Sequence, residues 1–158
     1  MTRIKGWFSK TPPEAVSVPD EELRFALGVK SGQKVCLFHA PKYILPLFLV
    51  GDLKLTMDWV ESDSDVILYW LQPQDDAVNI MTNLELMIKR NGRVWLVVPQ
   101  KEAARKQGVG GWGDIRSAVL EATSLVDNKT LVFGNGECGT QFVPRKAVKE
   151  KRVAVDMA

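Results

Sequence analysis

Runs of consecutive apolar residues, separated by a segment with helical periodicity, constrain the fold of this chain more than any other feature. The runs lie within residues 34–39, 65–71 and 93–98. A strand that is apolar at nearly every position is buried on both faces, which is typical of a parallel sheet covered by helices. Before the last run, the apolar residues recur at helical spacing: Ala77, Ile80, Met81, Leu84 and Ile88. This alternation of strands and helices predicts an α/β domain.

Capping signals set the expected ends of the helices. Ser17 is a good N-cap and Gly28 a good terminating glycine, which predicts a helix between them. Asp75 and Asp76 open the helix described above, and Asn91-Gly92 is expected to close it. A further helix is expected to begin at Asp114, its predicted N-cap.

The remaining strands complete the expected sheet. A short strand is predicted over 53–59, and two more over 130–133 and 140–143. Asn135-Gly136, between the last two, is the strongest short hairpin signal. The expected fold is therefore a three-layer, Rossmann-like α/β fold with a mostly parallel sheet and a C-terminal antiparallel hairpin.

The basic charge is concentrated at the end of the chain. Residues 145–158 contain five Lys or Arg and two Asp or Glu, which gives this segment a net charge of +3. Because the whole chain has a net charge of +2, the remaining residues carry about −1. We expect a single domain over 17–146, an N-terminal arm over 1–16 and a basic tail over 147–158. A nucleic-acid binder would usually spread its basic residues over the folded body, so nucleic acid is not an expected partner.

Cysteine and histidine content argues against a redox or metal site. Cys36 and Cys138 lie far apart in sequence and the chain has one histidine, so no zinc or other metal site is expected. The N-terminus lacks the apolar core of a signal peptide. The most apolar stretch, 43–50, is too short to span a membrane. We expect a cytoplasmic protein with no membrane partner.

Several segments resemble the class I S-adenosylmethionine-dependent methyltransferases. Residues 27–35, Leu-Gly-Val-Lys-Ser-Gly-Gln-Lys-Val, are similar to the lead into the first strand of that fold. Residues 88–96, Ile-Lys-Arg-Asn-Gly-Arg-Val-Trp-Leu, are similar to the lead into its fifth strand, and 65–69 to its fourth. The resemblance covers about residues 20–145 and implies a methyltransferase-like fold with a reversed last strand.

The chain departs from that family at the turn after the first strand. Methyltransferases have a glycine-rich turn there, where the backbone approaches the cofactor closely. Here the turn begins His39-Ala40-Pro41, without glycine, and Pro41 has no N–H to donate. The segment between the second and fourth strands is also too short for a third strand and its helix. We therefore expect no cofactor, S-adenosylmethionine being disfavoured.

With these departures, the chain resembles a small bacterial family of proteins with a domain of unknown function on a reduced, degenerate methyltransferase-like fold. In that family an asparagine-alanine-proline type turn replaces the glycine-rich loop. A proline-lysine loop and a helix start with aspartate and arginine follow. Pro99, Lys101, Asp114 and Arg116 stand at similar positions here. No established activity transfers through this resemblance.

Two polar residues are expected at the ligand-binding edge of the sheet. His39 follows the first run, and open α/β sheets bind ligands at the carboxyl ends of their strands. Its imidazole would serve as an acid, a base or an anion donor, or would only bond a nearby carbonyl and fix the loop. Asp58, nineteen residues on, would bind ribose hydroxyls or be a solvated strand-end carboxylate.

The loop over 99–113 is a candidate anion site. Gly110 and Gly111 would let backbone amides turn inward, and Lys101 and Arg105 would add positive charge beside a helix N-terminus. Trp112, between glycines, is expected near a pocket or an interface. An N-cap carboxylate would oppose a phosphate there, and the alternative is a plain surface loop.

Three functions are compatible with these features. The first is a non-catalytic methyltransferase-like domain that binds a small anionic ligand or a protein partner. The second is an S-adenosylmethionine-dependent methyltransferase with an atypical cofactor turn. The third is a structural or interaction module without a ligand.

Overall fold

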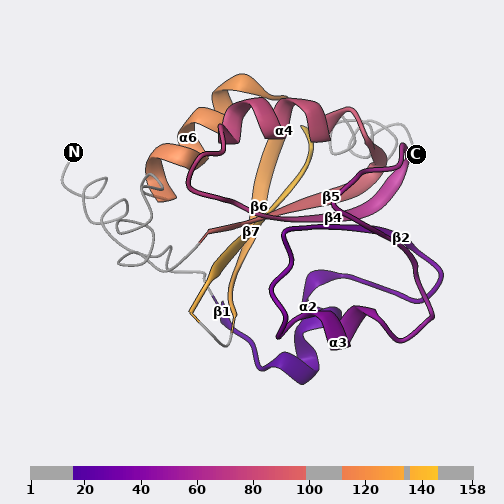
Figure 1. Cartoon of the computed structure of the whole chain (residues 1–158). Helices are drawn as coiled ribbons and strands as arrows, with labels where there is room; N and C mark the ends of the chain where they lie inside the picture. Colours follow the sequence, from indigo (N-terminus) through magenta and orange to yellow (C-terminus); the bar gives the residue numbers. More distant parts are fainter. Residues whose placement is uncertain (1–15, 99–111, 134–135, 146–158) are drawn as a thin grey trace, which may run out of the picture.

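A seven-stranded sheet forms the centre of the computed structural model, which describes residues 16–98, 112–133 and 136–145 (Figure 1). Its strands are β1 (Val16–Ser17), β2 (Lys34–Phe38), β3 (Lys54–Met57), β4 (Ser64–Trp70), β5 (Ile88–Val98), β6 (Leu125–Val132) and β7 (Cys138–Pro144). They lie in the order β1-β6-β7-β5-β4-β2-β3. All neighbours pair in parallel except β7, which is antiparallel to β5 and β6. The predicted α/β fold and its C-terminal hairpin are confirmed.

The sheet ends at β3. Only residues 58–63 connect β3 to β4, and β4 lies on the other side of β2. A strand and a crossover helix need a dozen or more residues, so this connection has no room for them. The prediction that the third strand of a full methyltransferase fold is missing is therefore confirmed for this segment, and β3 is left at the edge.

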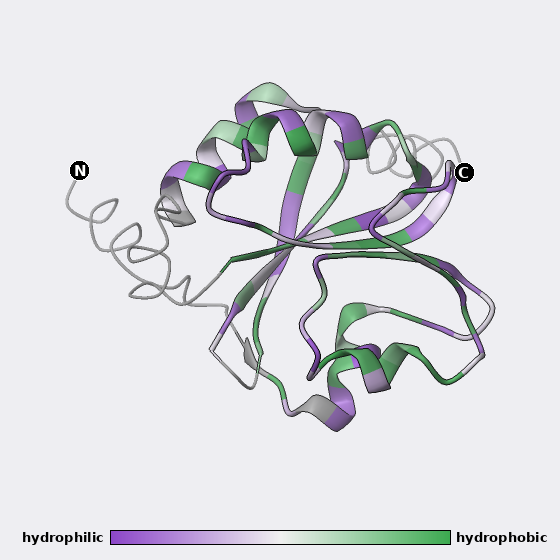
Figure 2. Ribbon diagram, in the orientation of Figure 1, coloured by the Kyte–Doolittle hydropathy of each residue, from purple (hydrophilic) through white to green (hydrophobic). Residues whose placement is uncertain are grey.

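Helices cover both faces of the sheet. A 3-10 turn (Asp20–Glu22), α2 (Leu23–Leu27) and α3 (Leu45–Phe48) pack on one face, and α4 (Ala77–Glu85) and α6 (Trp112–Ala122) on the other (Figure 1). Each face has its own apolar core, and Figure 2 shows hydrophobic residues concentrated along the central strands. In the described ranges, no helix has the length and apolar character needed to cross a membrane.

Two tryptophans anchor the core on the α2 side. Trp95 is fully buried, and its indole N–H donates a hydrogen bond to the carbonyl of Leu27 at 3.0 Å. Trp70 is also buried and contacts Phe133 edge-on, with ring centroids 6.3 Å apart. Both residues lie in central strands of the sheet, β4 and β5. The Trp95 bond ties the end of α2 to the middle of the sheet, since a buried indole N–H needs a partner.

The predicted start of the first helix is wrong. Ser17 does not cap a helix but pairs with Val132 in the parallel β1–β6 ladder, and α2 begins only at Leu23. Strand pairing satisfies the backbone of this segment, and tertiary context outweighs the capping preference of a serine. The predicted end is confirmed, because Gly28 caps α2 in the left-handed conformation with φ 77°.

Two further boundaries differ from the prediction. Asn91-Gly92 does not end α4, which stops at Glu85; these residues lie within β5. Ile88 pairs with Ser64 and Arg93 with Val66, so pairing with β4 on both sides of Asn91-Gly92 outweighs the local turn preference. Asp114 is not an N-cap either, since α6 begins at Trp112 and Asp114 lies in its first turn. A carboxylate there still favours the helix through the dipole.

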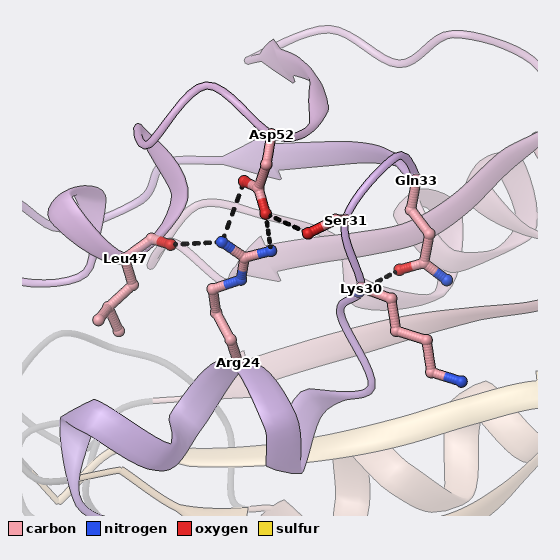
Figure 3. A network of polar contacts seen from close by, with 6 residues as sticks. All are labelled: Arg24, Lys30, Ser31, Gln33, Leu47 and Asp52. Atoms are coloured by element: carbon pink, nitrogen blue, oxygen red, sulfur yellow. Dashed lines mark hydrogen bonds and ion pairs between the residues drawn. The ribbon is translucent and has the colours of Figure 1, made fainter.

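An ion pair holds the amino ends of β2 and β3. The guanidinium of Arg24 on α2 contacts both carboxylate oxygens of Asp52, at 3.1 and 2.9 Å (Figure 3). Arg24 also donates to the carbonyl of Leu47, and the Ser31 hydroxyl donates to Asp52 at 2.6 Å. The hydrogen bonds from Arg24, and then that from Ser31, lower the pKa of the Asp52 carboxyl to about 2. The network fastens α2 to the edge opposite the carboxyl ends of the strands.

This network predicts a specific loss of stability in acid. Because the pKa of Asp52 is lower in the folded chain than in the unfolded chain, its stabilising contribution is present above the unfolded pKa, near 3.9. The contribution disappears as the pH falls from there towards 2. Denaturant unfolding at pH 6, 4 and 2.5 should show that native protein loses more stability than Asp52→Asn. An Asp63→Asn control, on another exposed turn, should follow the native protein, and identical profiles for all three would contradict the prediction.

Candidate functional site

The turns after β2 and β3 meet at the carboxyl edge of the sheet. His39 follows β2 and Asp58 follows β3, and both adopt the left-handed conformation, with φ 60° and 64°. The backbone N–H of His39 donates to Asp58 Oδ1 at 2.9 Å. Both residues were expected at this edge, and the structure brings them together. The hydrogen bond shows that one Asp58 oxygen supports the turn.

A tyrosine and a second aspartate extend this pair across the strand ends. The His39 ring contacts the Tyr69 ring nearly perpendicularly, with centroids 5.4 Å apart. The Tyr69 hydroxyl donates to Asp75 Oδ2 at 2.9 Å, and the backbone N–H of Gln72 donates to the same oxygen. Burial, followed by this bond to Asp75, raises the pKa of Tyr69 well above its usual value. Its hydroxyl is therefore a protonated donor, and Asp75 is held as an acceptor.

A hollow of about 290 Å³ lies beside these contacts and is lined in part by Gln72 and Asp75. It is bounded by the β4–α4 turn and the first turns of α6, which lie on the same face of the sheet (Figure 1). Its lining is mainly apolar, with a few polar groups: Leu71, Gln72, Pro73, Asp75, Asp76, Ala77, Val78, Asp114, Ile115 and Ala118. An apolar hollow with a few convergent polar groups is the usual form of a small-molecule site.

The described residues that line the hollow carry negative charge. Asp76 caps α4 by accepting a hydrogen bond from the Asn79 N–H at 3.2 Å, and Asp75 accepts those described above. Asp114 is exposed on the first turn of α6. The lining includes three aspartates and, among described residues, neither lysine nor arginine. Amines and hydroxyl donors suit this wall better than anions do.

Most residues of the predicted anion site belong to a segment that the structure does not describe. Lys101, Arg105, Gly110 and Gly111 lie outside the described residues. Trp112 is the first residue of α6, two positions before Asp114. An anion at the loop stays a prediction.

Neither cysteine is a ready nucleophile. Cys36 is buried and its thiol donates to the carbonyl of Trp59 at 2.7 Å, and burial raises its pKa to about 11. Burial likewise raises the pKa of Cys138 to about 11. Both thiols are therefore protonated near neutral pH, whereas the reactive form is the thiolate. Within 16–98, 112–133 and 136–145, no group of three or more metal-ligating side chains is suited to hold an ion.

A carboxylate that sequence analysis missed lies on the other face of the same edge. Glu137, in the β6–β7 turn, accepts hydrogen bonds from the Tyr43 hydroxyl at 2.5 Å and the Trp70 indole at 3.1 Å. It fixes the hairpin to the loop after β2. No local signal predicts this contact, because 94 positions separate Tyr43 from Glu137. Tyr69 and Asp75 were missed for a different reason. Tyr69 fits a buried strand and Asp75 fits the start of a helix, so the sequence suggests no further role for either residue.

Solved structures share this fold. A methyltransferase described as S-adenosylmethionine-dependent, from Aquifex aeolicus, has a TM-score of 0.61 at 12% identity, covering 78% of this chain and 88% of its own. A TehB-like S-adenosylmethionine-dependent methyltransferase from Corynebacterium glutamicum has a TM-score of 0.53 at 10% identity, with coverage of 90% and 95%. The N-methyltransferase NodS from Bradyrhizobium japonicum has a TM-score of 0.55 at 14% identity, with coverage of 78% and 93%.

Compared by sequence, the chain matches no protein-family model and no curated protein. Identities of 10 to 14% show the fold alone. The chain therefore has a methyltransferase-like fold, and its own side chains must carry any argument about function.

Proposed function

We propose that this chain is a methyltransferase-like domain that does not transfer methyl groups and that binds a small, amine-bearing ligand in the hollow beside α4 and α6. The observation that carries the first half is the hydrogen bond from the His39 N–H to Asp58 Oδ1. A turn whose backbone donor is already used has less to offer a cofactor.

The chemistry of the turn supports this interpretation. The glycine-rich turn of methyltransferases lets the backbone approach the cofactor closely, because glycine has no side chain in the way. Here the left-handed position is filled by His39, whose imidazole contacts Tyr69, and Pro41 two residues later contributes no N–H. Asp58, at the end of the second parallel strand, is drawn onto the turn rather than left for ribose hydroxyls alone.

The hollow supports the second half of the proposal. Its apolar residues, among them Ile115 and Ala118 of α6, suit a small organic body. Asp114 supplies a negative charge at the exposed rim, where an amine gains a charge-assisted hydrogen bond.

Ligand titrations test the proposal with putrescine, a small diamine, and inorganic phosphate as probes. Putrescine should raise the thermal unfolding midpoint by about 5–10 °C at a hundredfold excess over its dissociation constant. Asp114→Asn should weaken this shift, because it removes the rim charge. Glu121→Gln, on the exposed far end of the same helix, should not. A shift by phosphate alone would favour the anionic ligand, and no shift by either probe would favour a module without a small ligand.

A second candidate is an S-adenosylmethionine-dependent methyltransferase with an atypical cofactor turn. The shared fold and the position of Asp58 at a strand end favour it. Because the His39 N–H is already bonded to Asp58 and Pro41 has no N–H, we expect S-adenosylmethionine to bind weakly or not at all. A calorimetric titration that gave a dissociation constant of about 10 μM or lower, or about 7 kcal/mol of binding, would replace the first proposal with this one. Asp58→Asn is the matched variant, and it should leave an already weak signal unchanged.

A further inference from the structure

Two donors hold one oxygen of Asp75, in the turn between β4 and α4. The Tyr69 hydroxyl donates to Asp75 Oδ2 at 2.9 Å, and the backbone N–H of Gln72 donates to the same oxygen at 2.9 Å. These bonds use both lone pairs of Oδ2. Among the described residues, no donor reaches the other oxygen, Oδ1. Because Asp75 lines the hollow, a ligand there meets a carboxylate with one open oxygen.

Packing fixes the position of the Tyr69 hydroxyl. The side chain is buried, and its ring contacts the Phe38 ring with centroids 5.2 Å apart and the His39 ring with centroids 5.4 Å apart. Phe38 is also the partner of Tyr69 in the parallel ladder between β2 and β4. A side chain held in this way has little rotamer freedom left to lose. The hydroxyl therefore holds Asp75 in place before a ligand binds, which lowers the entropic cost of binding.

Asp75 differs in exposure from the other two aspartates of the hollow. Asp75 is half-buried, whereas Asp76 and Asp114 are exposed. Asp76 also caps α4 with one of its oxygens. A hydrogen bond to a charged group is stronger where less water surrounds it, and an unpaired charge there costs more. Asp75 is therefore the carboxylate of the hollow that gains most from a cationic ligand.

A single open oxygen distinguishes between two kinds of cation. A guanidinium binds a carboxylate best through two parallel N–H···O bonds, one to each oxygen. At Asp75 the second oxygen is already used by Tyr69 and Gln72. An ammonium is a compact charge with rotatable donors, and one oxygen is enough to bind it.

We propose that Asp75 binds the cationic group of the ligand and that Tyr69, as a positioning residue, makes the hollow selective for an ammonium over a guanidinium. The inference rests on the proposed function and narrows its amine-bearing ligand to an alkylammonium. Asp114, exposed at the rim, attracts either cation without distinguishing between them.

Calorimetric titration of the full chain with butylamine and with butylguanidine tests the selectivity, because the two probes share an alkyl group and a charge. Native protein should bind butylamine about fivefold more tightly, or better. Tyr69→Phe removes one donor from Asp75 Oδ2 and lets the carboxylate turn, so the ratio of the two dissociation constants should fall towards one. Asp75→Asn should weaken butylamine binding about tenfold and abolish the preference.

Two variants serve as controls. Asp114→Asn should weaken the binding of both probes and keep the ratio of their dissociation constants. Glu121→Gln, far from the hollow on the same helix, should leave both constants within about twofold of the native values. The ratio does not depend on how much of a variant is folded, so it separates positioning from a general loss of structure. Should Tyr69→Phe not fold, Asp75→Glu moves the carboxylate off its two donors and should lower the ratio in the same way.

The outcomes distinguish this inference from the function on which it rests. Equal affinity for the two probes, tighter binding of butylguanidine, or a ratio that neither Tyr69→Phe nor Asp75→Asn changes would overturn the inference and leave the proposed function standing. Native protein that binds neither probe would overturn the proposed function, and the inference with it.

Discussion

Replacing Trp95 with alanine is expected to lower the free energy of unfolding by about 3–5 kcal/mol, a large share of the roughly 5–15 kcal/mol that stabilises a domain. The side chain is fully buried in the core between the sheet and α2. Its removal leaves a cavity against Phe133 and Gly139, because neighbouring side chains relax only partly. It also leaves the buried carbonyl of Leu27 without its indole donor.

Urea unfolding followed by far-ultraviolet circular dichroism measures this loss. Trp59→Ala is the matched control, because it deletes the same side chain from an exposed position and should change stability by about 0.5 kcal/mol or less. Trp95→Phe should lie between the two, since it keeps most of the volume and loses the N–H donor. A loss below about 1.5 kcal/mol for Trp95→Ala would show that the sheet does not depend on this contact.

The central strands could be predicted because burial on both faces leaves a mark in the sequence. β2 and β4 are apolar at nearly every position, and this holds in β5 from Val94 to Val98. The first part of β5 carries Lys89, Arg90 and Asn91 in sequence, all exposed. No periodicity marks those residues as a strand, and only the pairing of Ile88 with Ser64 places them there. Boundaries fail where tertiary pairing, not local preference, decides the conformation.

The candidate site was predictable to the same extent. His39 and Asp58 stand at strand ends, and strand ends of a parallel sheet meet at one edge, so their proximity follows from topology. The contact between His39 and Tyr69 also needs the order of the strands, with β4 next to β2. The role of Asp75 as an acceptor for Tyr69 needs the path of the turn after β4. Such contacts depend on three-dimensional distances that leave no spacing rule in the chain.

Gly92 shows how a residue that suggests a turn can instead be required by a sheet. Following asparagine, it resembles the end of a helix, yet it is buried within β5 opposite the irregularity in register between Ser64 and Val66. A Cβ atom built at this position would lie 2.9 Å from the Ser64 carbonyl oxygen and 3.1 Å from that of Asp65. Both neighbours are backbone atoms, which cannot turn aside as a flexible side chain would. The close approach of β4 to β5 therefore depends on the absence of a side chain.

Gly92→Ala is accordingly expected to destabilise the fold by about 1–3 kcal/mol, the usual effect of forcing an extra methyl group into a packed site. The same substitution also reduces the backbone freedom of the unfolded chain, which by itself would stabilise the folded state by about 0.4–1 kcal/mol. The sign of the measured change in the free energy of unfolding therefore shows whether the steric effect or the entropic effect is larger. Asn91→Ala, at the exposed neighbouring position, adds no Cβ and should change stability by about 0.5 kcal/mol or less. Chemical unfolding of the three proteins makes the comparison. A stabilised Gly92→Ala variant would mean that β4 and β5 can separate here without loss, and that the register shift does not depend on the glycine.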